Sequence, residues 1–288
     1  MLDPKGWLPG HLRRGPHTIS PTAHYTGYVW AHHQLGDPGL ATLEGRLMHG
    51  VGRVLQSPVE LLGGPTLEHF LLARHRLIDH LLTEHISTGA VRQVVELACG
   101  MSPRGLRLVG RHPELSYVEV DLPAMAARKK AALDRIGTDR TRHRVQPADV
   151  LADGLTAVFA ALDDTTGVAV VTEGLLNYLP TEEVVRLWSR LAEELRAFPH
   201  GVYLSDLHVA ARVGPPDRLL AFGLGLAVRG RIHFHFADDD AAADALLTSG
   251  FATSRLHAPS EYADVLPGMT AAGADRVRVL EAWQGRMG

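Results

Sequence analysis

The chain has 288 residues, 45% of them hydrophobic, and a formal net charge of −3 at pH 7. This length suits one large α/β core with additional material for a cap, and the balanced charge lacks the basic stripe of a nucleic-acid-binding protein. The single cysteine, Cys99, excludes an intramolecular disulfide and a cysteine metal cluster.

The sequence also lacks the marks of export and of membrane insertion. Residues 1–15 hold prolines, glycines and charges in place of an apolar core, so we expect no signal peptide. The longest apolar stretch, residues 219–228, is about half of the roughly 20 residues that span a bilayer. We therefore expect a cytoplasmic protein without membrane or nucleic-acid partners.

The N-terminal part is expected to form a helical cap. Aromatic and histidine side chains are dense in the segment His24–His33, which either ties down an N-terminal arm or forms a lid over a ligand. Apolar residues then recur every three or four positions over residues 43–55 and 66–83, as in amphipathic helices. We predict an arm and helical cap over residues 1–88 and a core over residues 89–288.

The apolar run Val94–Ser102, which ends in small residues, predicts a buried strand that leads into a tight loop. The small side chains of Ala98, Cys99 and Gly100 would let the backbone approach a bulky ligand. A small apolar side chain explains Cys99 better than a catalytic thiol does. Glu96 lies inside the strand, where an unpaired carboxylate is costly. A ligand is the simplest reason for these features.

A second predicted strand, residues 117–120, ends at Asp121, twenty-one residues after Gly100. A doubly wound sheet places the carboxylate that binds a ribose at this position, so we predict a nucleoside site. NAD is disfavoured, because the loop lacks the third glycine of the dinucleotide motif and has Pro103, which offers no N–H to a phosphate. The pattern is similar to the S-adenosylmethionine loop of class I methyltransferases.

Further strands are predicted at residues 145–150, 167–172, 202–205 and 232–236, and closing strands from residue 251 and over 275–280. Helices are predicted at residues 105–110, 124–135, 181–197 with Thr181 as N-cap, and from an Asp238–Asp240 cap to residue 247. This alternation predicts an α/β fold with a doubly wound, Rossmann-like, seven-stranded sheet, mostly parallel with an antiparallel last strand. An N-terminal helical cap and a lid insertion would complete it.

Polar residues follow the two central strands, at the edge where open α/β sheets bind ligands. The segment Glu173–Pro180 follows one strand and Asp206–His208 the next. The Gly- and Pro-containing stretch at about residues 207–231 is too long for an ordinary connection, and we interpret it as a substrate lid. His233 and His235 would share one face of their strand, but no third ligand lies at metal-binding spacing, so no metal site is predicted.

With these residues placed, the chain resembles the leucine carboxyl methyltransferase family, in the branch that contains bacterial polyketide and small-acid O-methyltransferases. Four blocks in the family order carry the resemblance, and Glu281–Trp283 in the last strand adds a weaker fifth. The four blocks are Ala73–Asp79, Val95–Arg104, Val118–Pro123 with Lys129 beyond, and Thr172–Pro180. Their joint occurrence is far more specific than a single glycine loop.

The resemblance implies an S-adenosyl-L-methionine cofactor and a role for each matched residue. Arg74 would meet the methionine carboxylate, Asp121 the ribose hydroxyls and Glu173 the methionine amino group. The loop at residues 98–100 would lie along the methionine and ribose, and Asp149 near the adenine. The whole implied cofactor-binding set is Arg74, Glu96, Ala98, Cys99, Gly100, Asp121, Leu122, Asp149, Val150 and Glu173.

The loop also departs from the family pattern, because Ser102 and Pro103 stand where the family usually has Asp and Thr. The residues that would orient the methyl acceptor, chosen by position, are His208, Tyr178, Asn177 and Tyr25. We expect a small-molecule partner, a carboxylic acid or a phenol, and allow for a homodimer.

Three other interpretations stay open. A phenol or amine acceptor would need a base, for which His208 beside Asp206 is the candidate. A cofactor-binding protein that does not methylate is supported only by Ser102 and Pro103, and a metal-dependent hydrolase lacks ligand spacing.

Overall fold

The computed structural model describes residues 21–50, 67–152, 154–210, 233–271 and 273–284. Its centre is one seven-stranded sheet with the strand order β3-β2-β1-β4-β5-β7-β6. The strands are β1 (Gln93–Leu97), β2 (Ser116–Asp121), β3 (His143–Pro147), β4 (Val168–Thr172), β5 (Gly201–Leu207), β6 (Thr253–His257) and β7 (Arg278–Gln284). The strands β1 to β5 are parallel, and β7 lies antiparallel between β5 and β6. The predicted seven-stranded, mostly parallel sheet is confirmed.

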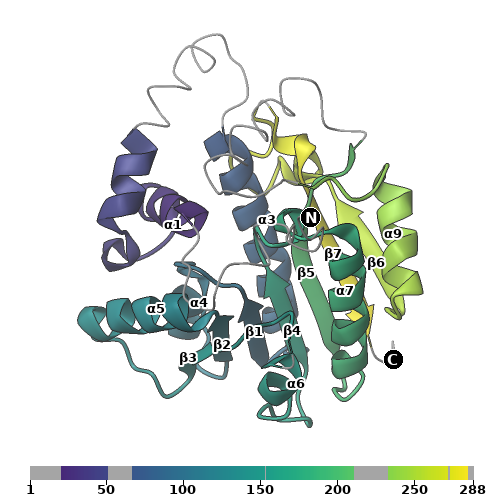
Figure 1. The fold of residues 1–288 in the computed structure, drawn as a ribbon, viewed down its shortest axis with the longest axis horizontal. Helices are drawn as coiled ribbons and strands as arrows, with labels where there is room; N and C mark the ends of the chain where they lie inside the picture. Colours follow the sequence, from purple (N-terminus) through teal and green to yellow (C-terminus); the bar gives the residue numbers. More distant parts are fainter. Residues whose placement is uncertain (1–20, 51–66, 153, 211–232, 272, 285–288) are drawn as a thin grey trace, which may run out of the picture.

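Helices cover both faces of this sheet (Figure 1). One face packs against α3 (Leu67–Ser87) and α4 (Arg104–Arg111), with α5 (Pro123–Ile136) beside β2 and β3. The other face packs against α6 (Gly154–Phe159), α7 (Thr181–Leu195) and α9 (Asp239–Thr248). The fold is therefore doubly wound.

The alternation of side chains along the strands decides which layer each residue joins. Val95 and Leu97 of β1 pack with the α6–α7–α9 layer, whereas Val94 packs with α3 and α4. Because side chains alternate along a strand, Glu96 points to the α3–α4 side, away from the more apolar layer. Burial of these apolar side chains, at about 25 cal/mol per Å², drives the assembly of the layers.

Strand order reverses between β1 and β4, because the chain runs outward from β1 to β3 and then returns to β4 on the other side. Ligands of open α/β sheets bind at such a switch point, outside the carboxyl ends of the strands. The predicted site residues after β1, β2, β4 and β5 therefore belong to one edge of the sheet.

The N-terminal region begins with α1 (Pro21–His32), followed by a short 3-10 helix η2 (Pro38–Leu40) and a helix over residues 43–50. In Figure 1, α1 lies above α4 and α5. A Cβ built on Gly27 of α1 would lie only 2.7 Å from Met101 Cβ, so a glycine is what lets α1 approach the loop after β1. Among the helices that the structure describes, none is long and apolar enough to cross a bilayer.

Three local expectations are wrong. The third strand ends at Pro147 and not near Asp149, because the Asp149 carboxylate accepts a hydrogen bond from Leu151 N (3.0 Å) and turns the chain. The N-cap of α7 is Pro180, and Thr181 is its first helical residue. The cap predicted for α9 is confirmed, because Asp238 accepts a hydrogen bond from Ala241 N.

The third wrong expectation is a strand at residues 232–236, where residues 233–236 are irregular. Their backbone hydrogen bonds go to other loops, from His233 N to Asn177 O and from Ala210 N to Phe236 O (both 2.8 Å). The alternation still places the His233 and His235 rings on one side, stacked with centroids 6.0 Å apart, while Phe236 stacks on Trp188. Most of the predicted lid, residues 211–231, lies outside the described residues.

Candidate functional site

The loop after β1 is a tight turn that contains two residues with positive φ angles. Ala98 and Gly100 both have a φ of 52°, in the left-handed region that an alanine rarely adopts. Cys99 N donates to Val120 O at 3.2 Å, which holds this loop against the end of β2. Burial raises the pKa of the Cys99 thiol well above its usual value. The thiol therefore stays protonated and packs as a small apolar group.

Asp121 joins the two loops that follow β1 and β2. Its Oδ2 accepts a hydrogen bond from Gly100 N and its Oδ1 one from Leu122 N, each at 2.7 Å. Burial raises the pKa of the Asp121 carboxyl, although these two hydrogen bonds oppose the shift. Each carboxylate oxygen can accept more than one hydrogen bond, so Asp121 retains acceptor capacity for a diol.

Arg74, on α3, bridges the ends of β4 and β5. Its Nε donates to Glu173 Oε1 at 3.2 Å and its Nη1 to Asp206 Oδ2 at 2.8 Å. The other oxygen of Asp206 accepts a hydrogen bond from Gly174 N at 2.6 Å. Gly174 has a φ of +69°, and a Cβ there would lie 2.9 Å from Arg74 Nη2, so glycine is required beside the guanidinium.

A second arginine, Arg104 at the start of α4, is fully buried among carboxylates. Its Nε donates to Asp79 Oδ1 at 2.6 Å, its Nη2 to Glu173 Oε2 at 2.5 Å, and its Nη1 to Glu96. Tyr117 also donates to Glu96 from its hydroxyl, at 2.8 Å. The buried carboxylate of Glu96 thus has two partners within the protein, Arg104 and Tyr117, and no ligand is needed to explain it.

Glu173 is the carboxylate that both Arg74 and Arg104 contact. Arg74, Arg104 and His75, whose Nδ1 lies 2.8 Å from Glu173 Oε2, surround it. Burial by itself raises the pKa of the Glu173 carboxyl, but the contacts with His75, Arg104 and Arg74 outweigh it and hold the pKa well below its ordinary value. Glu173 is therefore ionised at neutral pH.

The residues predicted near an adenine lie just beyond β3. Ala148 N donates to Asp121 O at 2.9 Å, so this segment continues beside the end of β2. Asp149 is exposed, whereas Val150 is buried in the α6–α7–α9 layer. Both lie at the same edge of the sheet as Asp121.

The predicted acceptor residues fall into two groups. His208, after β5, contacts the rings of Phe70 and Phe234 edge-on, with centroids 6.3 Å and 6.5 Å away. Phe70 lies one helical turn before Arg74 on α3, so His208 is near the arginine cluster. Burial by itself lowers the pKa of the Arg74 guanidinium, but Asp206 and Glu173, with a smaller contribution from Tyr178, outweigh it and raise the pKa, which places Tyr178 near Arg74.

Asn177 and Tyr25 have other neighbours. The Asn177 side chain donates to His233 O at 2.6 Å and holds the segment that follows the predicted lid. Tyr25 is buried between α1 and α3, against Leu71 and Leu72. It faces the ring of His49, with centroids 6.1 Å apart.

Sequence reasoning gave no site role to Arg104, His75 and Asp79, and it named Asp206 only as a neighbour of His208. One signal was available for Arg104, because a carboxylate inside an apolar strand, as at Glu96, demands a buried cation. No spacing rule identifies which arginine that is.

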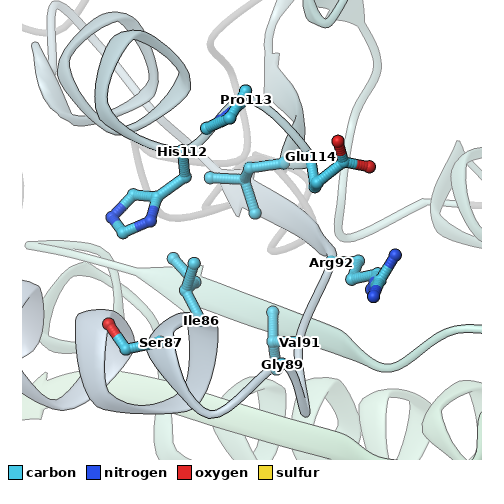
Figure 2. A pocket seen from close by; sticks show the side chains of 9 residues that line it. Ile86, Ser87, Gly89, Val91, Arg92, His112, Pro113 and Glu114 are labelled. Atoms are coloured by element: carbon cyan, nitrogen blue, oxygen red, sulfur yellow. The ribbon is translucent and has the colours of Figure 1, made fainter.

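A cavity of about 250 Å³ lies at the opposite edge of the sheet (Figure 2). It is lined by the end of α3, the turn into β1 and the segment between α4 and β2, including Ile86, Arg92 and Glu114. It therefore lies apart from the cluster around Glu173. No group of three or more His, Cys, Asp or Glu side chains able to hold a metal ion occurs in the part of the chain that the structure describes.

Two solved structures with the same fold are named as methyltransferases. A "putative methyltransferase" from Thermobifida fusca YX superimposes with a TM-score of 0.65 at 13% identity, covering 98% of this chain and 100% of that one. An O-methyltransferase family protein from Burkholderia thailandensis gives a TM-score of 0.53 at 16% identity, covering 76% and 59%. At these identities the likeness shows the fold alone.

Sequence relatives are more informative. A protein of Mycobacterium sp. (strain KMS) named "Putative S-adenosyl-L-methionine-dependent methyltransferase" is 35% identical over 149 residues, 51% of this chain and 46% of its own length. A protein of the same name from Mycolicibacterium gilvum (strain PYR-GCK) is 35% identical over 126 residues, 43% of this chain and 40% of its own length. The match thus spans about half the length of these relatives or less.

The family model described as leucine carboxyl methyltransferase matches residues 46–192, just over half of the chain. This range contains Arg74, the loop after β1, Asp121 and Glu173, which the structure brings to one edge of the sheet. The resemblance carried by the four sequence blocks is therefore confirmed. The chain belongs to the leucine carboxyl methyltransferase family.

Proposed function

We propose that this chain is an S-adenosylmethionine-dependent O-methyltransferase that acts on a carboxylate of a small molecule of the secondary-metabolite type. The observation that carries the proposal is that Arg74 contacts Glu173, and Asp121 contacts Gly100, at one edge of the sheet. Family membership supports the same cofactor. A cofactor with a carboxylate, an ammonium and a ribose diol requires a guanidinium and two carboxylates, and this edge of the sheet offers them together.

The described residues fit that cofactor in charge and in acceptor capacity. Asp121 has acceptor capacity left for hydroxyls. Glu173 is ionised and matches an ammonium, and the planar guanidinium of Arg74 matches a carboxylate. The cofactor supplies an electrophilic methyl group on a sulfonium. The protein would contribute orientation and exclusion of water, which account for most of the acceleration of an in-line displacement.

A carboxylate acceptor suits this site, because a carboxylate is already ionised at pH 7 and needs no general base. In the rival interpretation, His208 deprotonates a phenol or an amine, and the Asp206 carboxylate orients His208. Both oxygens of Asp206 accept hydrogen bonds from Arg74 and Gly174. These contacts explain Asp206 without a role beside His208, and the match to the leucine carboxyl methyltransferase family favours a carboxylate acceptor.

The direct test is calorimetric titration with S-adenosylmethionine and with S-adenosylhomocysteine, with and without a chelator. We expect both to bind and the chelator to change nothing. A screen of small carboxylic acids for methyl-ester products by mass spectrometry would then identify the acceptor class. No binding of either compound would refute the assignment, and N- or C-methylated products alone would refute the carboxylate acceptor.

The substitution Asp121→Ala is expected to weaken S-adenosylmethionine binding by about thirtyfold or more, which corresponds to about 2 kcal/mol. The change removes the ribose acceptor together with the clamp on Gly100 N and Leu122 N. Asp164→Ala is the matched control, because Asp164 is exposed in the turn before β4, at the edge of the sheet opposite Asp121. If the wild type and Asp121→Ala bind S-adenosylmethionine with equal affinity, the assignment of Asp121 to the cofactor site is wrong.

The rate of the chemical step should be nearly flat from about pH 6 to 9, because a carboxylate with a pKa near 4 is ionised throughout. His208→Ala should lower this rate about tenfold or less, through lost positioning. Single-turnover rates across that range are the measurement. A steep acid limb that His208→Ala abolishes, with a loss on the order of 10²-fold, would establish base catalysis instead.

A further inference from the structure

Helix α1 lies on the loop that follows β1, and one face of the helix makes this contact. Ala23, Gly27 and Trp30 are four and three residues apart, so they share that face. A Cβ built on Gly27 would lie 2.7 Å from Met101 Cβ, and one built on Gly100 would lie 3.2 Å from Ala23 Cβ. Two small residues thus let the backbone of α1 approach the loop. The third residue of the face, Trp30, belongs to the same side of α1.

Trp30 also reaches the charged residues around Glu173. Its ring contacts the imidazole of His75 on α3, with centroids 4.7 Å apart. His75 Nδ1 lies 2.8 Å from Glu173 Oε2, while Arg74 Nε donates to the other oxygen, Oε1, at 3.2 Å. Two side chains, those of His75 and Glu173, therefore link Trp30 to Arg74.

The indole N–H of Trp30 is a buried donor without an acceptor among the described residues. Trp30 is 4% exposed, and its Nε1 makes no hydrogen bond to any of them. An indole N–H can only donate, and a buried donor without an acceptor destabilises the protein. Native structures leave few such groups unpaired. A ligand bound at this edge of the sheet would supply the missing acceptor.

Among the polar groups of S-adenosylmethionine, the methionine carboxylate fits this donor. The ammonium and the sulfonium are positively charged and accept no hydrogen bond. The ribose and the adenine are assigned to the loops after β2 and β3, where Asp121 and Asp149 lie. A carboxylate has about four acceptor sites, and Arg74 can fill only part of them, because its Nε and Nη1 already donate to Glu173 and Asp206.

We propose that Trp30 is a cofactor-binding residue whose indole N–H donates a hydrogen bond to the methionine carboxylate of S-adenosylmethionine, beside Arg74. This inference rests on the proposed function and adds a residue of α1 to the cofactor site. Of the two interpretations of the aromatic segment His24–His33, it favours a lid over a ligand. The donor is neutral, so the contact adds direction to the charge attraction of Arg74.

Calorimetric titration of Trp30→Phe with S-adenosylmethionine and with its decarboxylated form tests the contact. The decarboxylated form keeps the adenosine, the sulfonium and the ammonium, and it lacks only the carboxylate. We expect the substitution to weaken S-adenosylmethionine binding about tenfold or more, because a hydrogen bond to a charged group is lost. The decarboxylated form should bind the variant within about twofold of its affinity for the wild type.

The outcomes separate this proposal from the proposed function. Equal losses of affinity for the two compounds would overturn the proposal, because the indole would then support the fold of α1 and not the carboxylate. Unchanged affinity for S-adenosylmethionine would overturn it as well and would leave the proposed function intact. Absence of S-adenosylmethionine binding to the wild type would instead refute the proposed function.

Trp188→Phe is the matched control for the same change of side chain. Trp188 is also buried, but it lies in the α6–α7–α9 layer, where it stacks on Phe236 and neighbours the Tyr203 hydroxyl. Both affinities of this variant should stay within about twofold of the wild-type values. If Trp188→Phe lost S-adenosylmethionine affinity as selectively as Trp30→Phe, the assignment to Trp30 would be wrong.

The wild type alone gives an independent measurement should Trp30→Phe fail to fold. The chain has four tryptophans, so a nitrogen-15 NMR spectrum contains few indole N–H signals. A hydrogen bond to a carboxylate should move one of them downfield when S-adenosylmethionine is added, and not when the decarboxylated form is added. If no indole signal distinguishes the two compounds, Trp30 does not bind the carboxylate.

Discussion

Lys129→Met is expected to lower the free energy of unfolding by about 3–5 kcal/mol, because it leaves a buried carboxylate without its cation. Lys129 Nζ lies 2.8 Å from Glu119 Oε1, as an ion pair and not as a well-aligned hydrogen bond, and both side chains are fully buried. His143 Nε2, 3.2 Å from Glu119 Oε2, cannot by itself supply the missing charge without taking up a proton. Denaturant unfolding of the variant and the wild type measures the loss.

Two further variants make this experiment specific. Lys130→Met changes the adjacent, exposed lysine and should alter stability by less than about 0.5 kcal/mol. The double variant Lys129→Met with Glu119→Gln removes both charges and should recover about half of the loss or more. An equal effect of the two single lysine variants would show that the ion pair does not stabilise the fold.

The pH dependence of this pair follows from the two pKa shifts. Burial raises the pKa of the Glu119 carboxyl, but Lys129 and His143 outweigh it and the pKa is lowered. Burial lowers the pKa of Lys129, but the carboxylates of Glu119 and Glu96 outweigh it and the pKa is raised. The stabilisation is therefore complete between about pH 5 and 10 and is lost below the folded-state pKa of Glu119 and above that of Lys129.

Glu173→Gln is expected to weaken S-adenosylmethionine binding on the order of a hundredfold. The substitution removes a charge-assisted hydrogen bond to the ammonium, which contributes about 1.5–3 kcal/mol, and keeps the side chain's shape. It also leaves Arg74 and Arg104 with one counter-ion fewer, so the free energy of unfolding should fall as well. Calorimetric titration and denaturant unfolding report the two effects separately.

The control for this variant is Glu182→Gln, which neutralises an exposed acid in the first turn of α7. It should leave cofactor affinity within about twofold of the wild-type value, because surface charges contribute little. Glu173→Gln binding S-adenosylmethionine as tightly as Glu182→Gln would mean that Glu173 only balances the arginines. The role implied by the family resemblance would then be wrong.

The sequence by itself determined the doubly wound sheet and the position of Asp121 beside Gly100. Both follow from local rules, since apolar strands alternating with helices specify the layers and the carboxyl ends of parallel strands meet at one edge. The order of the family blocks added Arg74 and Glu173. These residues are identified by chain position alone, so no contact had to be known in advance.

The tertiary structure alone decided which charges meet. Arg104 contacts Asp79, Glu96 and Glu173, which lie 25, 8 and 69 residues away in the chain. Among 29 basic residues, no spacing distinguishes Arg104 as the one buried there. The same reason explains why the strand predicted at residues 232–236 is wrong. Alternating side chains indicate only that one side of a segment is buried, whereas a strand also needs a neighbouring backbone to pair with. Both failures concern partners that are distant in the chain, and only the folded backbone brings those partners within hydrogen-bonding distance.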